Sequence, residues 1–297
     1  MIISHTLGGL GNQMFQYAFG RALSLHYDVP LKLDVMDFAG YELHNGFELS
    51  RVFDLSVETA SDSDFYEVLG WLGNRLARKV VRRLGYSKIK SAPILSQDNS
   101  VSAKEYIKIA GQSCYLTGYW QSESYFLGEK KTIREEFQFK TLMSAENEKW
   151  AEKIRNCHSV SVHVRRGDYV SNPHTHSVHG VCGIDYYNNA INYINERFEG
   201  LTFFVFSDDI PWALENLSIP SSSYYIDHNH GAESYNDMHL MSLCKHHIIA
   251  NSSFSWWGAW LSDSVDSSRH VVIAPEHWAN LQAIKFDEIY PNKWVRL

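Results

Sequence analysis

Strand and helix patterns alternate along the second half of the chain, and this alternation limits the fold more than any other feature. Residues 159–164 alternate polar and apolar side chains, and residues 201–206 form an apolar strand pattern, with helical spacing between them at 186–198. Further helices are expected at 211–217, 235–245 and 254–261, and further strands at 224–226, 248–250 and 270–273. Strands that alternate with helices are joined by crossovers, so we expect a doubly wound parallel sheet.

The N-terminus predicts a second unit of the same kind. A strand pattern at 2–7 leads into the glycine-rich turn at 8–13, helical spacing follows from Met14, and another strand pattern occupies 31–35. A strand–helix–strand unit of this size is a parallel crossover. A charged, mostly helical stretch at 128–155 suits a linker, so we expect an α/β chain with two Rossmann-like domains that face a cleft. The expected domains are 1–150 and 151–297.

The net negative charge of the chain argues against a nucleic-acid partner. Lys and Arg number 27 and Asp and Glu number 34, which gives a net charge of −7.

Residues 75–90 are strongly basic although the chain as a whole is acidic, because they contain seven basic residues and no acidic one. Leu72, Leu76, Val80 and Leu84 recur there every four residues, which predicts a helix. Two interpretations stay open: a solvated helix face, or a basic amphipathic helix that contacts an anionic membrane.

The cysteines have the spacing of neither a zinc site nor a disulfide framework. They are Cys114, Cys157, Cys182 and Cys244. We expect free thiols in a reducing compartment. The first residues lack the basic and apolar regions of a signal peptide, and no stretch has the apolar length of a membrane span. The expected location is the cytoplasm, with peripheral contact at the inner membrane face through 75–90 as the alternative.

Two adjacent arginines follow the strand expected at 159–164. In open α/β sheets, ligands bind at the carboxyl ends of the strands, and the N–H donors of arginine fit phosphate oxygens. Neighbouring strand side chains point to opposite faces, so we expect one arginine to bind a phosphate and the other to pair with a carboxylate such as Asp168. A structural salt bridge in a surface loop is the alternative. The candidate residues are His163, Arg165, Arg166 and Asp168.

Two further strand ends carry polar residues. Asp208 and Asp209 follow the strand at 201–206, and their carboxylates suit recognition of a base or ribose, a divalent-metal site, or a helix cap. We prefer the base or ribose because the arginines already supply positive charge for a diphosphate. The third strand end leads into Ser253 and Ser255 at a helix start, which suits an anion, with capping as the alternative. The three tryptophans of that helix are expected to line the cleft.

The glycine-rich turn GGLGNQ does not have the G-x-G-x-x-G spacing of a dinucleotide site, because Met14 stands at the place of the third glycine. We expect a tight turn that brings the backbone close to a ligand in the cleft. Its candidate residues are Gly9, Gly11, Asn12 and Gln13. The histidines closest to one another are His174, His176 and His179, and His228 and His230. None has carboxylates at metal-ligand spacing, so no metal is expected.

Six segments together resemble the bacterial α-1,2-fucosyltransferases of glycosyltransferase family 11. They are GGLGNQMFQYAFGRAL at 8–23, GYWQSE at 118–123, HVRRGDYV at 163–170, HGVCGIDYY at 179–187, FSDD at 206–209 and HHIIANSSFSWWGAWL at 246–261. The resemblance implies a GT-B-like fold, inversion at the anomeric carbon, GDP-fucose as co-substrate and no metal cofactor. It also implies that domain 1–150 is the acceptor side and domain 151–297 is the donor side. It further implies that Arg165 binds the donor diphosphate, that Ser253 or Ser255 contacts a phosphate, and that Asn12 lies near the reaction centre.

The implied activity is transfer of L-fucose from GDP-fucose to the 2-hydroxyl of a β-galactoside, free or lipid-linked, in the synthesis of O-antigen or another surface glycan. Asp168 and His5 are candidates for a general base on chemistry alone, with a structural role as the favoured interpretation of each. Three alternatives remain: a related enzyme with another linkage or acceptor, a non-catalytic glycan-binding module, and a nucleotide-binding interaction protein. The oligomeric state is not predicted.

Overall fold

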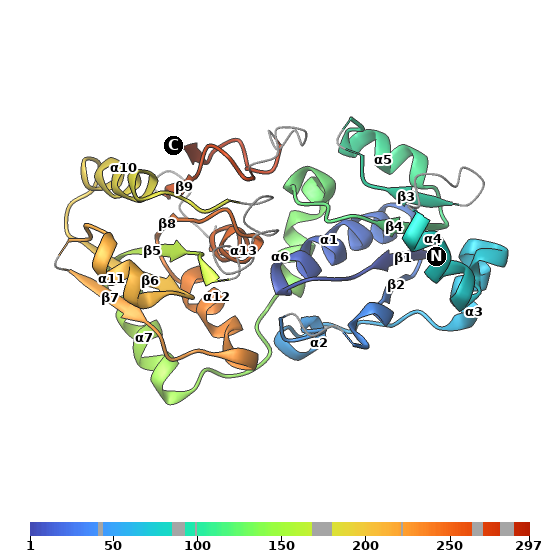
Figure 1. Ribbon diagram of the computed structural model, residues 1–297, viewed down its shortest axis with the longest axis horizontal. Coiled ribbons are helices and arrows are strands. Elements are labelled where there is room, and N and C mark those ends of the chain that lie inside the picture. The colour runs from blue at the N-terminus through green and yellow to red at the C-terminus, as the bar shows by residue number, and fades with distance from the viewer. Residues whose placement is uncertain are drawn as a thin grey trace. The chain divides into compact units, whose positions relative to one another are not determined.

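The computed structural model contains two parallel sheets, one in each of two units, Met1–Lys140 and Thr141–Leu297 (Figure 1). It describes the chain except for residues 41–43, 85–92, 99, 168–179, 221, 263–269 and 280–287, and it describes 81–84 by their backbone only. The predicted α/β class with two parallel sheets is confirmed. Among the described residues, no helix has the length and apolar character needed to cross a membrane.

The sheet of unit 1 has the strand order β2-β1-β4-β3, and all its neighbouring strands are parallel. Its strands are β1 (Ile2–His5), β2 (Leu31–Asp34), β3 (Ile94–Ser96) and β4 (Cys114–Thr117). Helix α1 (Leu10–Tyr27) packs closely on this sheet at Gly20, where an added Cβ would lie 2.8 Å from Leu31 Cδ1 and 3.2 Å from Ser4 Cβ. A glycine is therefore needed for this close contact.

The remaining helices of unit 1 are short. They are η1 (Met36–Phe38), α2 (Leu49–Val52), α3 (Asp62–Leu69), η2 (Gly70–Gly73), α4 (Arg75–Leu84), α5 (Ala103–Ala110), η4 (Glu123–Glu129) and α6 (Lys130–Glu136). Helix α3 packs its Phe65 and Leu69 against Ile3 and Tyr115 of the sheet. Both α3 and α5 begin with a capping box, in which a serine and a carboxylate three residues later satisfy each other's backbone N–H groups.

The sheet of unit 2 has the order β10-β9-β8-β5-β6-β7, again parallel throughout. Its strands are β5 (His158–Val164), β6 (Leu201–Ser207), β7 (Ser223–Ile226), β8 (His246–Ile248), β9 (Val272–Ala274) and β10 (Val295–Arg296). Its helices are α7 (Ala145–Arg155), α10 (Ile184–Asn195), α11 (Ile210–Asn216), η5 (Gly231–Glu233), α12 (Tyr235–Ser242) and α13 (Ser253–Leu261).

Strand β6 is apolar on both faces because helices cover both sides of this sheet, with α10 and α7 on opposite sides (Figure 1). Phe203 and Val205 belong to the core formed with α10. Phe204 and Phe206 point the other way and belong to the core formed with α7 and α12. This two-sided burial explains the uninterrupted apolar pattern seen in the sequence.

Helix α4 corrects one expectation. The helix predicted from Leu72 begins at Arg75, because Leu72 lies in η2. Within α4, Leu76 and Val80 of the apolar row are exposed, whereas Arg78 is buried at 2% exposure. The physical reason is that the Arg78 guanidinium lies over an aromatic ring of α3, 3.6 Å from its centroid, and fixes that side of the helix against the unit.

Candidate functional site

The arginines after β5 are each paired with an aspartate at the end of the neighbouring strand β6. Arg165 Nη1 lies 3.1 Å from Asp208 Oδ2, and Arg166 Nε lies 3.2 Å from Asp209 Oδ2. The backbone N–H of Arg166 also donates to Asp208 Oδ1 at 2.7 Å. Because β5 and β6 are parallel neighbours, their carboxyl ends meet at one edge of the sheet, where ligands of open α/β folds bind.

The two arginines differ in their surroundings. The Arg166 guanidinium lies 3.9 Å from the centroid of the Trp212 ring, which sandwiches it between α11 and its aspartate. The carboxylate that pairs with Arg166 is therefore Asp209. Asp168, the partner named from the sequence, lies outside the described residues. The Arg165 side chain is 27% exposed and that of Arg166 is 18% exposed.

Both aspartates have structural contacts of their own. Asp209 caps α11 by accepting from the backbone N–H of Trp212 at 3.2 Å, so the helix-cap interpretation applies to it. Asp208 lies against Gly167, where an added Cβ would be 2.8 Å from Asp208 Oδ2. The two aspartates and the two arginines therefore form one ion-paired cluster. From the sequence, we expected them to act as separate ligand groups.

His163 is the penultimate residue of β5 and is buried at 6% exposure. Burial lowers its pKa to about 4, so the imidazole is neutral at pH 7. No described residue forms a hydrogen bond with its Nδ1. The ring lies 5.9 Å from that of Phe254, at the start of α13. His163 is thus a neutral, apolar-packed histidine beside the arginine cluster.

The two serines at the start of α13 are not equivalent. Ser255 is fully buried, and its hydroxyl donates to the backbone carbonyls of Ser252 at 3.3 Å and Ala250 at 3.5 Å. Ser253 is the first residue of the helix and is partly exposed. Ser252 caps the helix by accepting from the backbone N–H of Phe254. Of the two predicted phosphate contacts, only Ser253 is accessible, beside the N-terminal N–H groups of α13.

The tryptophans of α13 do not line a cleft, so that prediction is wrong. They are Trp256, Trp257 and Trp260, and their exposures are 0%, 0% and 2%. Trp256 Nε1 donates to the backbone carbonyl of Ile289 at 2.8 Å, and the rings pack against one another. Apolar burial explains them better than ligand contact, because a large ring gains most when it is fully removed from water.

In unit 1, the glycine-rich turn joins β1 to α1. Gly8 has φ +90°, and an added Cβ there would lie 2.9 Å from Asn12 Nδ2, so a larger residue would be strained. Gln121 Nε2 donates to Asn12 Oδ1 at 2.7 Å. This hydrogen bond sets the orientation of the Asn12 carboxamide. The Asn12 side chain is partly exposed. Gly9 is the residue before α1, and Gly11 is buried in its first turn.

Gln13 is buried and ties this turn to a second loop. Its Nε2 donates to the carbonyls of Gly8 and Gly46, each at 2.8 Å, and its Oε1 accepts from the backbone N–H of Glu48 at 2.9 Å. Its role in the fold is structural. His5, a candidate base, lies at the end of β1 with Nε2 2.9 Å from Asp37 Oδ2.

The contacts made by Gln121 and Trp212 were not predicted from the sequence. Gln121 lies within the segment GYWQSE, which was used only as part of the family resemblance and was assigned no role of its own. Trp212 follows the aspartates in the chain, but its stacking on an arginine depends on β5 and β6 being neighbours, which no local pattern encodes.

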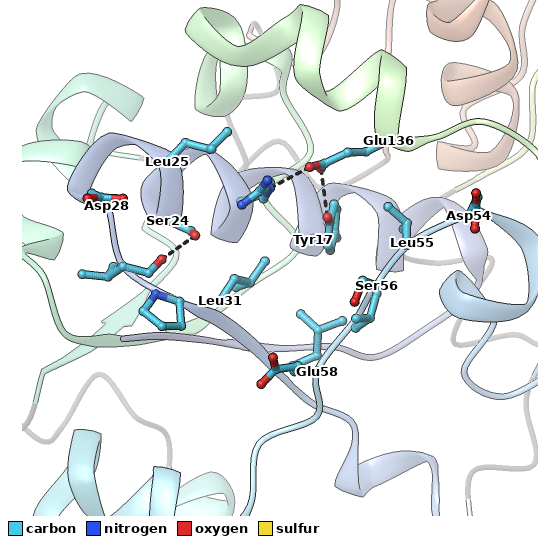
Figure 2. Close-up of a pocket in the computed structure, with 15 residues that line it drawn as sticks. Tyr17, Ser24, Leu25, Asp28, Leu31, Asp54, Leu55, Ser56, Glu58 and Glu136 are labelled. Carbon is cyan, nitrogen blue, oxygen red and sulfur yellow. Dashed lines mark hydrogen bonds and ion pairs between the residues drawn. The ribbon is translucent and has the colours of Figure 1, made fainter.

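A cavity of about 640 Å³ lies elsewhere in unit 1, along α1, the turn into β2 and the segment 54–58 (Figure 2). Glu136 is held there by Tyr17 Oη at 2.9 Å and by Arg21 Nε at 2.8 Å. Burial and the nearby Glu136 carboxylate raise the pKa of Tyr17. None of the site candidates that the structure describes lines this cavity, and Glu136 joins α6 to α1 there.

Among the described residues, no group of three or more His, Cys, Asp or Glu side chains could hold a metal ion. His174, His176 and His179 lie outside the described residues. His228 Nε2 lies 2.8 Å from Asn147 Oδ1. The four cysteines are free thiols, as predicted.

The chain is similar in sequence to known glycosyltransferases. The family model described as Glycosyl transferase family 11 matches residues 88–297. An alpha-1,2-colitosyltransferase of Escherichia coli is 38% identical over 298 positions, covering 100% of this chain and 99% of that protein. The O-antigen biosynthesis glycosyltransferase WbnK of Escherichia coli is 33% identical, covering 91% and 92%. Galactoside alpha-(1,2)-fucosyltransferase 1 of Oryctolagus cuniculus is 26% identical, covering 87% of this chain and 63% of that protein.

Solved structures show the same architecture. The fucosyltransferase NodZ from Bradyrhizobium matches with a TM-score of 0.53 at 11% identity, covering 87% of this chain and 91% of that one. NodZ alpha-1,6-fucosyltransferase co-crystallised with GDP matches with a TM-score of 0.51 at 12% identity, covering 86% and 90%. These matches show that the chain has the GT-B-like fold expected from the resemblance. The chain is a member of glycosyl transferase family 11.

Proposed function

We propose that this glycosyltransferase transfers L-fucose from GDP-fucose, with inversion, to the 2-hydroxyl of a β-galactoside during synthesis of O-antigen or another surface glycan. The observation that carries the proposal is the family membership together with full-length similarity to an α-1,2-specific enzyme. The O-antigen assignment is supported by the similarity to WbnK. The acceptor is then a growing glycan, and a lipid-linked form is included in the proposal.

Unit 2 is the proposed donor side, and Arg165 its main diphosphate ligand. Arg165 stands at the carboxyl end of β5 with a partly exposed guanidinium oriented by Asp208. Ser253 and the first N–H groups of α13 offer further donors at the end of β8. Arg166 and Asp209 lock each other and brace this edge. We assign His163, Asp208 and Ser255 to supporting the shape of the donor site.

The proposed reaction is a direct displacement. The acceptor hydroxyl oxygen forms a bond to C1 of the sugar while the bond from C1 to the β-phosphate oxygen breaks, and the electron pair leaves with GDP. Negative charge grows on the β-phosphate, so Arg165 stabilises the transition state more than the bound donor. The acceptor proton passes to a base, for which His5, oriented by Asp37, is the described candidate.

Asn12 is the proposed polar group of unit 1 at the reaction centre. No described residue accepts a hydrogen bond from its Nδ2, and its Oδ1 is fixed by Gln121. The amide N–H₂ group is therefore the end of this side chain that a sugar hydroxyl would meet. The strained Gly8 and buried Gln13 keep the turn in place around it.

A second donor has a specific observation in its favour, since an α-1,2-colitosyltransferase is 38% identical to the chain. Colitose lacks the 3-hydroxyl of L-fucose, so the two donors differ by one polar group. A site that hydrogen-bonds this hydroxyl rejects the deoxy sugar strongly, whereas a site built for the deoxy sugar discriminates weakly.

A transfer assay tests the proposal. Purified protein is incubated with GDP-fucose or GDP-colitose and with β-galactosides that carry or lack the 2-hydroxyl, in buffer with and without EDTA. We expect transfer from GDP-fucose only to acceptors with a free 2-hydroxyl, and no loss with EDTA. Faster transfer from GDP-colitose than from GDP-fucose would identify GDP-colitose as the donor instead. Binding of galactosides without consumption of either donor would favour a glycan-binding module, and loss of activity with EDTA would contradict the metal-free mechanism.

A further inference from the structure

Exposed apolar side chains gather on η2 and α4 of unit 1. Trp71 is 71% exposed, Leu76 is 74% exposed and Val80 is 55% exposed. Leu76 and Val80 are four residues apart in the helix, so they lie on one side of it. Single exposed apolar residues are common on proteins, but an exposed apolar row on one side of a helix, in a segment that also exposes a tryptophan, is typical of an interaction surface.

The outward direction of this row is imposed from the opposite side of α4. Arg78 lies under the helix with its guanidinium over the Phe65 ring and an Nη2 atom 3.5 Å from Asp62 Oδ1. It also donates to the backbone carbonyl of Gly73. These contacts hold the Arg78 side of α4 against α3, so Leu76 and Val80 on the other side of the helix face outward. The exposed apolar row is therefore a fixed feature of the fold.

Basic side chains accompany the apolar row. Arg75 and Lys79, again four residues apart, are exposed next to Leu76 and Val80. The sequence from 71 to 90 contains no Asp or Glu. The preceding helix α3 carries acidic residues, of which Asp62 pairs with Arg78, Asp64 pairs with Lys32 and Glu67 is exposed. An apolar row beside a basic row, with an indole at its start, is the composition of helices that lie in a membrane interface.

We propose that the α4 face, consisting of Trp71, Arg75, Leu76, Lys79 and Val80, docks on an anionic lipid surface. The apolar side chains enter the headgroup region, and the two cations contact lipid phosphates. The charges of this face favour an anionic membrane over a second copy of the chain as its partner. A second copy of the same face would bring four cations together across an apolar contact, which is unfavourable, whereas an anionic membrane matches both rows. This docking does not depend on which sugar the enzyme transfers.

Vesicle co-sedimentation of the full chain tests the proposal. Vesicles of phosphatidylcholine alone are compared with vesicles that contain phosphatidylglycerol, at low and at high salt. We expect binding only to the anionic vesicles, weakened by salt. Arg75→Gln and Lys79→Gln should each reduce binding about fivefold, as loss of one lipid-facing cation implies. Leu76→Ser combined with Val80→Ser should reduce it by about tenfold or more.

Helix α5 provides matched controls in the same unit. Ile109 is 58% exposed there, and Lys104 and Lys108 are exposed. Ile109→Ser and Lys104→Gln with Lys108→Gln should leave vesicle binding unchanged, and thermal unfolding should show that all variants are folded. Equal losses from the α5 variants would overturn the proposal, as would absence of binding to anionic vesicles. A dimer in solution that Leu76→Ser with Val80→Ser dissociates would assign the face to a second copy instead.

Discussion

Replacing Arg165 by alanine tests whether this residue binds the donor diphosphate or only forms a structural salt bridge with Asp208. Arg165 and Asp208 are about a quarter exposed, so the loss of their ion pair should cost only about 1 kcal/mol of folding stability. In a unit of this size that is a fall of about 3 °C in the unfolding midpoint. The cost in the transition state is larger, because a donor aimed at developing charge is worth about 2.7 kcal/mol or more, or about 100-fold in kcat.

Asp208→Asn is the matched control. It removes the carboxylate charge that orients Arg165 but keeps a side-chain oxygen to accept from the Arg166 backbone N–H. We expect it to lower kcat less than about tenfold, since the guanidinium itself remains. Arg165→Lys should stand between the two, because lysine keeps the charge but not the fork of donors.

Two measurements decide the outcome: kcat for sugar transfer, and the affinity for GDP by calorimetry. Arg165→Ala should lose at least about tenfold in GDP affinity, whereas Asp208→Asn should retain most of it. If both variants lose equal activity and Arg165→Ala binds GDP normally, Arg165 is only the partner of Asp208, and the assignment is refuted.

Three further predictions concern Gly167, Gln121 and Asp237. Gly167→Ala forces the Asp208 carboxylate to move, because the new Cβ would lie 2.8 Å from its Oδ2; we expect kcat to fall by no more than Asp208→Asn lowers it, about tenfold at most, and unchanged kinetics would show that the cluster tolerates the shift. Gln121→Ala frees the carboxamide of Asn12, so kcat should fall about tenfold with little change in the KM for the donor. The double variant with Asn12→Ala should be no slower than Asn12→Ala alone, and additive losses would contradict this coupling. Burial raises the pKa of Asp237 to about 7, so its contribution to stability is present below pH 4 and is lost as the pH rises to 7. Urea unfolding should therefore show Asp237→Asn gaining stability over the natural chain across that range, by up to about 4 kcal/mol above pH 7, and a constant difference would be the contrary result.

The two sheets, and the strand ends at which the candidate residues stand, could be predicted because they depend on local periodicity. The apolar run of β6 required burial on both faces, and its neighbours Phe203 and Phe204 do belong to separate cores. The strand ends that carry Arg165 and Asp208 were identified for the same reason. Their direct pairing was not, because it follows from the order of strands in the sheet, which hydrophobic patterns do not encode.

The errors have specific physical causes. Helix α13 is apolar around its circumference, so its sequence cannot distinguish tryptophans that line a ligand site from those that fill a core. Helix α4 was assigned an apolar row by spacing, but a single arginine that stacks on Phe65 and reaches Asp62 determined which side faces inward. Such a contact joins two helices, and pattern analysis considers one helix at a time.

The two-sided burial of β6 limits how far the proposed donor edge can rearrange. Layers on both faces hold this strand, so its amide hydrogens can exchange with solvent only when unit 2 opens as a whole. Asp208 and Asp209 are attached directly to its end and inherit that rigidity. In the proposed donor site, the arginines that they orient would thus be positioned before any substrate arrives, and little free energy would be lost to reorganisation when charge moves during the reaction.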